Sequence, residues 1–281
     1  MSIELQLEQV SERTMAVVDR GGLHSNAGAV ILDSFVAAVD PTMKPPAARA
    51  FRRELERQSG LPVKFLLVTH CHPDHVFGTA PFKDTCIIGS VELAANVLRM
   101  AEWTPEIMEQ WKQANPTEAV DWFDEVEILL PTLGFQDRLE IRDADLIVQL
   151  FHAGGHTSCS SYAYVPQEKV LFAGDLMFAE CFPYAGDPTC DPERWMGIFG
   201  DFLSLDFEKL VPGHGPVVGK DEVEKHLAFF EALRDATKEA IRADEGHEAI
   251  QVPEFYGADE EDDWGRKATL EHWYTLYKNT E

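Results

Sequence analysis

The sequence is poor in basic residues, with 24 Lys and Arg against 49 Asp and Glu, and its formal net charge is −25. Such a surface repels phosphate backbones and anionic membranes at long range. The chain also lacks any apolar run of the roughly 20 residues that a membrane span needs. Its first residues, Met-Ser-Ile-Glu-Leu-Gln, lack the basic head and apolar core of a signal peptide. We therefore expect neither a nucleic-acid partner nor a membrane partner.

Cysteine is scarce and shows no C-x-x-C spacing. The five cysteines are Cys71, Cys86, Cys159, Cys181 and Cys190. An odd, scattered set is typical of free thiols in a reducing cytoplasm rather than of a disulfide framework. We expect a cytoplasmic protein, with a Cys181–Cys190 disulfide as the alternative.

The 281 residues, 45% hydrophobic and 26% charged, have the balance of one folded domain. Hydrophobic periodicity and turn residues predict strands over 3–10, 13–18, 28–32, 34–39, 63–68, 138–141, 146–151, 161–165, 170–173 and 209–211, and helices over 46–59, 90–101, 104–114 and 191–203. From Asp221, with Glu224 in the spacing of a capping box, apolar residues recur at helical intervals. We expect an α/β (α+β) domain over residues 1–220, with a helical C-terminal extension over 221–281 packed on it.

The motif with the clearest chemistry is His70-Cys71-His72-Pro73-Asp74-His75, directly after the apolar run at 63–68. Imidazole nitrogens and carboxylate oxygens suit zinc and other divalent first-row metals. His70 and His72 are two residues apart, so their side chains can point the same way. Cys71 then points elsewhere, and we interpret it as a small core residue.

This H-x-H-x-D-H motif after an apolar strand resembles the metallo-β-lactamase superfamily. Three later segments resemble that family's remaining ligand motifs: Gly154-Gly155-His156-Thr157, Ala173-Gly174-Asp175 and Pro212-Gly213-His214-Gly215. The resemblance covers about residues 5 to 220. It implies a four-layer αββα sandwich, so that residues 1–220 would be the catalytic domain.

The resemblance also implies a ligand set, similar to that of glyoxalase II. One metal would be held by His70, His72 and His156, the second by Asp74, His75 and His214, with Asp175 bridging the two. We expect two zinc ions per chain, with iron or manganese as alternatives. A metal-bridging hydroxide would be the nucleophile, and Asp74 would be the catalytic residue that orients it and moves its proton.

The implied activity is hydrolysis of a small ester, thioester, lactone or amide such as a β-lactam. The last motif is G-H-G-P where glyoxalase II typically has G-H-E-Y, and Phe178 stands where homoserine-lactone lactonases often have Tyr. The flavodiiron proteins have Glu at the position of His72, so hydrolysis is favoured over oxygen reduction. The alternative function is an iron-dependent oxidoreductase resembling the persulfide dioxygenases. An intact ligand set argues against a scaffold with a degenerate site.

Weaker candidates surround this set. Asp40 ends a predicted strand and could support the ligands or cap a turn, and His152 is expected to be structural or to contact a ligand. Phe178 and Tyr184 should border the site, with Tyr184 a candidate donor to an oxyanion. The aromatic segment 98–123 is either a lid over the site or ordinary helix packing, which we favour. The expected partner is a small-molecule substrate, and homo-oligomerisation is left open.

Overall fold

The computed structural model describes residues 5–20, 22–100, 109, 113, 120–260 and 263–280. Its first sheet has seven strands in sequence order: β1 (Glu8–Gln9), β2 (Thr14–Val17), β3 (Ala27–Ile31), β4 (Val36–Val39), β5 (Val63–Leu67), β6 (Cys86–Ser90) and β7 (Leu133–Phe135). Strands β1 to β4 pair antiparallel, and β4 to β7 pair parallel.

The second sheet has the order β12 (Lys209–His214), β11 (Val170–Phe178), β10 (Ser161–Val165), β9 (Leu146–His152) and β8 (Arg138–Asp143). Its pairs are antiparallel except for β11 with β12. The register of the β11–β12 pair shifts between Phe172 and Gly174 and again between Gly174 and Phe178. This irregular stretch contains Asp175.

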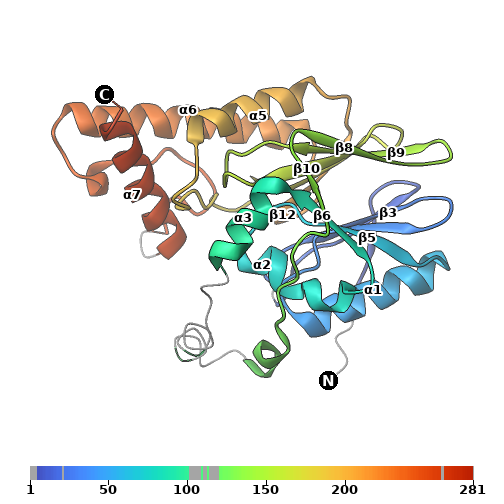
Figure 1. The fold of residues 1–281 in the computed structure, drawn as a ribbon. Coiled ribbons are helices and arrows are strands. Elements are labelled where there is room, and N and C mark those ends of the chain that lie inside the picture. Colours follow the sequence, from blue (N-terminus) through green and yellow to red (C-terminus); the bar gives the residue numbers. More distant parts are fainter. Residues whose placement is uncertain are drawn as a thin grey trace.

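The helices are α1 (Pro45–Ser59), α2 (Pro73–Val76), α3 (Val91–Met100), α5 (Pro192–Ser204), α6 (Lys220–Arg242) and α7 (Trp264–Lys278), with 3-10 turns over Phe77–Phe82, Val120–Glu125 and His247–Ala249. Helix α1 covers the outer face of the first sheet, and α5, α6 and α7 cover that of the second (Figure 1). Helix α1 begins with two prolines and ends at Gly60, whose φ of 70° is left-handed, as is common after a helix. Within the described ranges, no helix combines the length and the apolar character needed to cross a membrane.

Three apolar layers show why the chain folds as a sandwich. Between the two sheets lie Val30, Val39, Leu67, Val148 and Phe172, contributed by both. A second layer joins the first sheet to α1 and includes Phe51 and Leu55. The third joins the second sheet to α5, α6 and α7 through Trp195, Phe230 and Trp273, all of them fully buried. This is the predicted αββα arrangement with C-terminal helices.

The predicted elements agree with the structure at most positions, with some corrections. The capping box at Asp221 and Glu224 is wrong, because α6 begins at Lys220 and Gly219 is its N-cap. Strands β6 and β7 were not expected, since β6 is a run of five residues that leads directly into α3 and β7 has only three residues. The predicted helix over 104–114 lies outside the described residues apart from 109 and 113. Helices α6 and α7 belong to the same apolar layer as the second sheet, and the division at residue 220 stays a prediction.

Candidate metal centre

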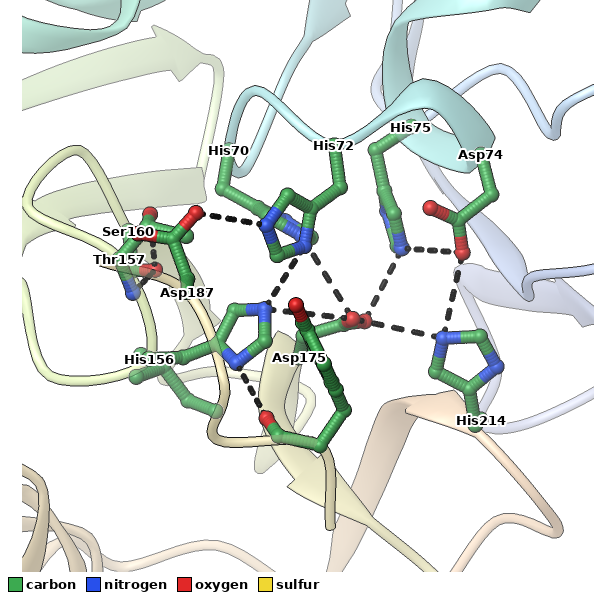
Figure 2. A network of polar contacts seen from close by, with 12 residues as sticks. His70, His72, Asp74, His75, His156, Thr157, Ser160, Asp175, Asp187 and His214 are labelled. Carbon is green, nitrogen blue, oxygen red and sulfur yellow. Dashed lines mark hydrogen bonds and ion pairs between the residues drawn. The ribbon is translucent and has the colours of Figure 1, made fainter. Parts of the chain in front are cut away.

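The predicted ligand residues come from four places that are distant in the sequence. His70 to His75 follow β5, and His156 lies in the loop between β9 and β10. Asp175 lies within β11, and His214 is the last residue of β12. The side chains converge on one space (Figure 2). Ligand sites of α/β sheets commonly lie beyond strand ends in this way.

The seven side chains form two groups that share one carboxylate. The first group is His70, His72, His156 and Asp175, and the second is Asp74, His75, Asp175 and His214. Within each group, one ligand atom per residue lies within 4.8 Å of all the others. This is the division that the family resemblance predicts, with Asp175 between the two groups.

Asp40 fixes the orientation of two of the histidines. Its Oδ2 accepts hydrogen bonds from His75 Nδ1 at 2.9 Å and from Thr69 Oγ1 at 2.8 Å, and its Oδ1 accepts from the Thr69 amide at 2.8 Å. Because the Thr69 hydroxyl donates to Asp40, it accepts from His70 Nδ1 at 3.1 Å. Both rings therefore carry their proton on Nδ1 and turn Nε2 toward the centre.

His156 is oriented by the backbone and His72 by another carboxylate. His156 Nδ1 donates to the Tyr184 carbonyl at 3.0 Å, which leaves Nε2 facing inward. His72 is reversed: its Nε2 lies 3.1 Å from Asp187 Oδ2, and its Nδ1 lies 3.0 Å from His156 Nε2. Asp187 also accepts from the backbone and hydroxyl of Thr189, at 2.7 and 2.6 Å. Figure 2 shows Asp187 beside the first group.

Three buried atoms at the centre lack a hydrogen-bond partner within the described part of the chain: His70 Nε2, His75 Nε2 and Asp175 Oδ1. His75 Nε2 approaches Asp175 Oδ1 to 3.0 Å without hydrogen-bond geometry. Orphaned buried polar atoms are costly unless something binds them.

The spacing of the donors fits a divalent ion. His70 Nε2 and His156 Nε2 each lie 3.5 Å from Asp175 Oδ2. In the second group, His214 Nε2 lies 3.3 Å from Asp74 Oδ2 and 3.4 Å from Asp175 Oδ2. Tetrahedral zinc with bonds of about 2.0–2.1 Å places its ligand atoms about 3.3 Å apart. The residues present therefore fit a pair of divalent ions.

The charges of the centre are strongly coupled. Burial opposes ionisation of Asp175, but His214, His75 and His70 outweigh it and hold the pKa of this carboxyl well below its usual value. Burial likewise opposes protonation of His214, but Asp175 and Asp74 raise its pKa to about 10. Burial, reinforced by neighbouring His72, lowers the pKa of His156 well below its usual value. An ion at the second group must therefore displace protons.

Two glycines allow the strands to approach the carboxylate. A Cβ on Gly213 would lie 1.9 Å from Asp175 Oδ1, and one on Gly174 would lie 2.6 Å from Thr69 Oγ1. Gly174 also has a φ of 52°, a conformation that side chains rarely adopt. Glycine at these positions is thus required by the packing around Asp175.

The weaker candidates fall into different places. Phe178 stacks on His214, with ring centroids 5.0 Å apart and planes 7° apart, and the Tyr184 ring lies 5.8 Å from His72. His152 Nε2 instead lies 2.8 Å from the Ser158 carbonyl, so it stabilises the loop rather than joining the ligand groups. Cys71 is buried in the apolar layer of the first sheet.

Of the tryptophans and phenylalanines in the aromatic segment 98–123, only Trp122 and Phe123 are among the described residues. Trp122 and Phe123 are buried and stacked at 4.0 Å, and Phe123 packs edge-on against Phe77. These two residues are part of the apolar layer under the first sheet, as ordinary packing predicts. Trp103 and Trp111 lie outside the described residues, so the lid stays a prediction.

Asp187 is the residue that sequence reasoning missed. It lies in the irregular loop after β11, and its partner His72 is 115 positions away. The local signal is weak: Asp187 precedes Pro188 and accepts from the amide two residues on, as turn-forming aspartates do. Such turns are common without any metal, so this signal alone does not identify a functional residue.

A cavity of about 530 Å³ opens over the metal-binding groups. It is lined by His24, Met43, His72, Pro73, Asp74, Asp175, Phe178, Phe182, Tyr184, His214, Asp263, Trp264 and Gly265. A substrate in this cavity would therefore contact both groups of donors and the first turn of α7.

Comparison with curated proteins finds distant relatives. The chain is 31% identical over 241 residues to the hydroxyacylglutathione hydrolase of Brucella ovis, covering 81% of the chain and 77% of that protein. It is 24% identical over 226 residues to the linear primary-alkylsulfatase of a Pseudomonas species, covering 70% and 42%. It is 26% identical over 216 residues to the alpha subunit of a Nocardioides 2,4-dinitroanisole O-demethylase, covering 75% and 58%. These last two matches thus span about half the length of the relatives concerned.

Among solved structures, a metallo-beta-lactamase from Pontibacter korlensis matches with a TM-score of 0.63 and 17% identity, covering 81% of this chain and 99% of that one. At this identity the match shows the fold alone. The family model of the metallo-beta-lactamase superfamily matches residues 20–214, which include all seven ligand candidates. The chain therefore belongs to the metallo-beta-lactamase superfamily and carries the His/Asp site typical of its metal-dependent hydrolases.

Proposed function

We propose that the chain is a hydrolase that uses two divalent metal ions, zinc in the first instance, to cleave a small ester, thioester, lactone or amide. The observation that carries this proposal is the convergence of five histidines and two aspartates into two groups sharing Asp175. The partnerless atoms His70 Nε2, His75 Nε2 and Asp175 Oδ1 at their centre support it, because a bound ion would satisfy all three.

Two bound ions would lower the pKa of a shared water, so that it attacks as hydroxide, and would polarise the substrate oxygen. Around them, Asp40 and Asp187 hold the ring orientations of His70, His72 and His75. Asp74 lines the cavity and its carboxylate is the group we expect to orient the nucleophile and carry its proton to the leaving group.

Tyr184 is suited to stabilise the substrate rather than the metal. Burial raises the pKa of its phenol, with Asp187 adding to the shift, so the hydroxyl stays protonated at neutral pH. The side chain lines the cavity, and its backbone carbonyl holds His156. A protonated phenol in this place can donate a hydrogen bond to an oxyanion that develops on the substrate.

The relatives support hydrolysis as the reaction class, since they include a hydroxyacylglutathione hydrolase and an alkylsulfatase. The five cysteines are all free thiols, which supports our proposal of a reducing, cytoplasmic location. We propose a small molecule as the partner because the cavity is of a size that suits one.

Elemental analysis together with a chromogenic panel of esters, thioesters, lactones, β-lactams and phosphodiesters tests the function. We expect two zinc per chain and turnover of at least one carbonyl substrate. Asp74→Ala and His72→Ala should abolish turnover, whereas Glu271→Gln, on the exposed face of α7, should retain it. One iron per chain with sulfur-dependent oxygen uptake would instead establish a persulfide dioxygenase-like activity.

A further inference from the structure

Apart from the metal-binding residues, most of the cavity lining is apolar or aromatic. Met43 follows β4, while Phe178, Phe182 and Tyr184 come from the end of β11 and the loop after it. Trp264 and Gly265 come from the start of α7. Helix α7 therefore contributes directly to the substrate cavity, rather than only covering the second sheet.

Trp264 is unlike the other tryptophans of the C-terminal half. Trp195 and Trp273 are fully buried in the apolar layer, whereas Trp264 is 72% exposed. Its ring lies 5.3 Å from the ring of Tyr184, at 50°. Both residues line the cavity, Trp264 exposed and Tyr184 half-buried, and such an aromatic pair is a surface on which an apolar or flat group can lie.

This pair is held in place by α7. Asp263 caps the helix by accepting from the Arg266 amide at 2.7 Å. One turn further, the Thr269 hydroxyl accepts from the Ala185 amide at 2.8 Å, next to Tyr184. The helix start and the loop after β11 are therefore joined, so Trp264 keeps its position over the cavity.

The described lining of this cavity contains neither Lys nor Arg to pair with an anion, and two of its histidines, His72 and His214, belong to the metal-binding groups. Its other charged members are Asp74, Asp175 and Asp263. Bound metal ions would attract one anionic centre at the scissile bond. A second carboxylate, placed along the aromatic wall, would be desolvated without a partner and would lie near Asp263.

We propose that this site takes uncharged substrates whose apolar or aromatic group lies against Trp264 and Tyr184, and that it rejects substrates with a second, anionic group away from the scissile bond. The inference rests on the proposed hydrolase function. It excludes glutathione thioesters and carboxylate-bearing β-lactams from the broader substrate range, although one relative is a hydroxyacylglutathione hydrolase. The metal-binding residues of the family are thus retained, while we infer that the recognition surface formed by Trp264 and Tyr184 selects a different substrate from that of this relative.

Two esters that differ only in a terminal charge test the proposal: 4-nitrophenyl valerate and 4-nitrophenyl hemiglutarate, whose chain ends in a carboxylate instead of a methyl group. With the zinc-loaded protein, we expect kcat/KM for the valerate to be higher by at least about tenfold. Equal rates, or a faster hemiglutarate, would overturn the proposal while leaving the hydrolase function intact.

Variants of α7 test the residues. Trp264→Ala should raise KM for the valerate by about three- to tenfold with little change in kcat. Trp264→Phe, which keeps an aromatic ring, should have a KM close to that of the unchanged protein. Asp263→Asn, which keeps an N-cap oxygen, should narrow the preference for the valerate over the hemiglutarate. Glu271→Gln on the same helix is the matched control. It should change neither KM for the valerate nor the ratio of kcat/KM between the two esters. An unchanged KM in Trp264→Ala would refute the role of the aromatic pair.

Binding separates this proposal from the proposed function. Valeranilide and glutaranilic acid are amide counterparts of the two esters, and their affinities for the zinc-loaded protein can be measured by calorimetry, with product analysis to check that the amides stay intact. We expect the neutral amide to bind more tightly, and Trp264→Ala to weaken it. If no ester is hydrolysed but this order of affinities holds, the hydrolase function fails and the recognition surface stands; the reverse order overturns the recognition surface.

Discussion

Asp187 offers the sharpest test of the centre, because it supports one metal-binding group and not the other. Its carboxylate accepts a hydrogen bond from His72 Nε2 at 3.1 Å. The proton of that ring is then on Nε2, so Nδ1 turns its lone pair toward the centre. Asp187→Ala removes this acceptor without removing any of the seven donors. Loss of such a supporting partner typically weakens metal binding by about 10- to 100-fold, equivalent to about 1.4–2.7 kcal/mol.

The effect should be confined to one ion. Stepwise zinc titration in competition with a chromophoric chelator should show one site weakened by that factor and the site of His75 and His214 unchanged. Asp187→Asn should have a smaller effect, since its side-chain oxygen can still accept from His72. If both zinc affinities are unchanged in Asp187→Ala, or fall equally, our assignment of Asp187 to the first group is wrong.

Three further predictions concern packing, metal linkage and pH. Gly213→Ala places a Cβ 1.9 Å from Asp175 Oδ1 and should weaken zinc binding at both sites by at least about tenfold. The control is Gly197→Ala in α5, where a Cβ meets nothing within 4 Å. It should leave both zinc affinities unchanged and stabilise the fold by about 0.5–1 kcal/mol. Removal of the metal by a chelator should lower Tm by about 5–10 °C. One ion at 100 times its Kd contributes about 2.7 kcal/mol, and each kcal/mol shifts Tm by about 2–4 °C. If scanning calorimetry gives the same Tm with and without chelator, the protein binds no stabilising metal. Hydrogen bonding to Arg52 lowers the pKa of Asp84 to about 2, so this pair stabilises the fold above the unfolded pKa near 4 and its contribution is lost as the pH falls through 2. Since Asp84 is two-thirds exposed, Asp84→Asn should cost only about 0.5 kcal/mol at pH 7 in urea unfolding and a small fraction of that at pH 2. An equal loss of stability at both pH values would refute the pairing.

The sequence predicted the ligand residues better than their surroundings. Of the seven candidate ligands, all but His75 stand beside a glycine or proline or directly after an apolar strand. The local pattern alone therefore indicates these six residues. Asp40 directly follows β4, and its place at a strand end made it a candidate, although the sequence left open whether it supports the ligands or caps a turn. Asp187 was missed because its role depends on His72, 115 positions away, and tertiary packing alone brings the two together.

The same limit applies to the fold. The mostly apolar strand β5 was predicted within one residue of its observed bounds, whereas β11 runs five residues past its predicted end at 173, and the short strands β6 and β7 were not expected. The contribution of Trp264 to the cavity could not be predicted either. Its position at a helix start suggests a surface residue, and only the docking of α7 beside Tyr184 places it at the cavity mouth.

Each of the two donor groups draws on both sheets. His70 to His75 follow a strand of the first sheet, while His156, Asp175 and His214 belong to the second. A filled centre would therefore cross-link the two halves of the sandwich at one edge, in the way that a disulfide joins distant parts of a smaller protein. Metal loss should then raise amide hydrogen exchange at the ends of β5, β11 and β12 together, because bound ions would also hold the two sheets against each other.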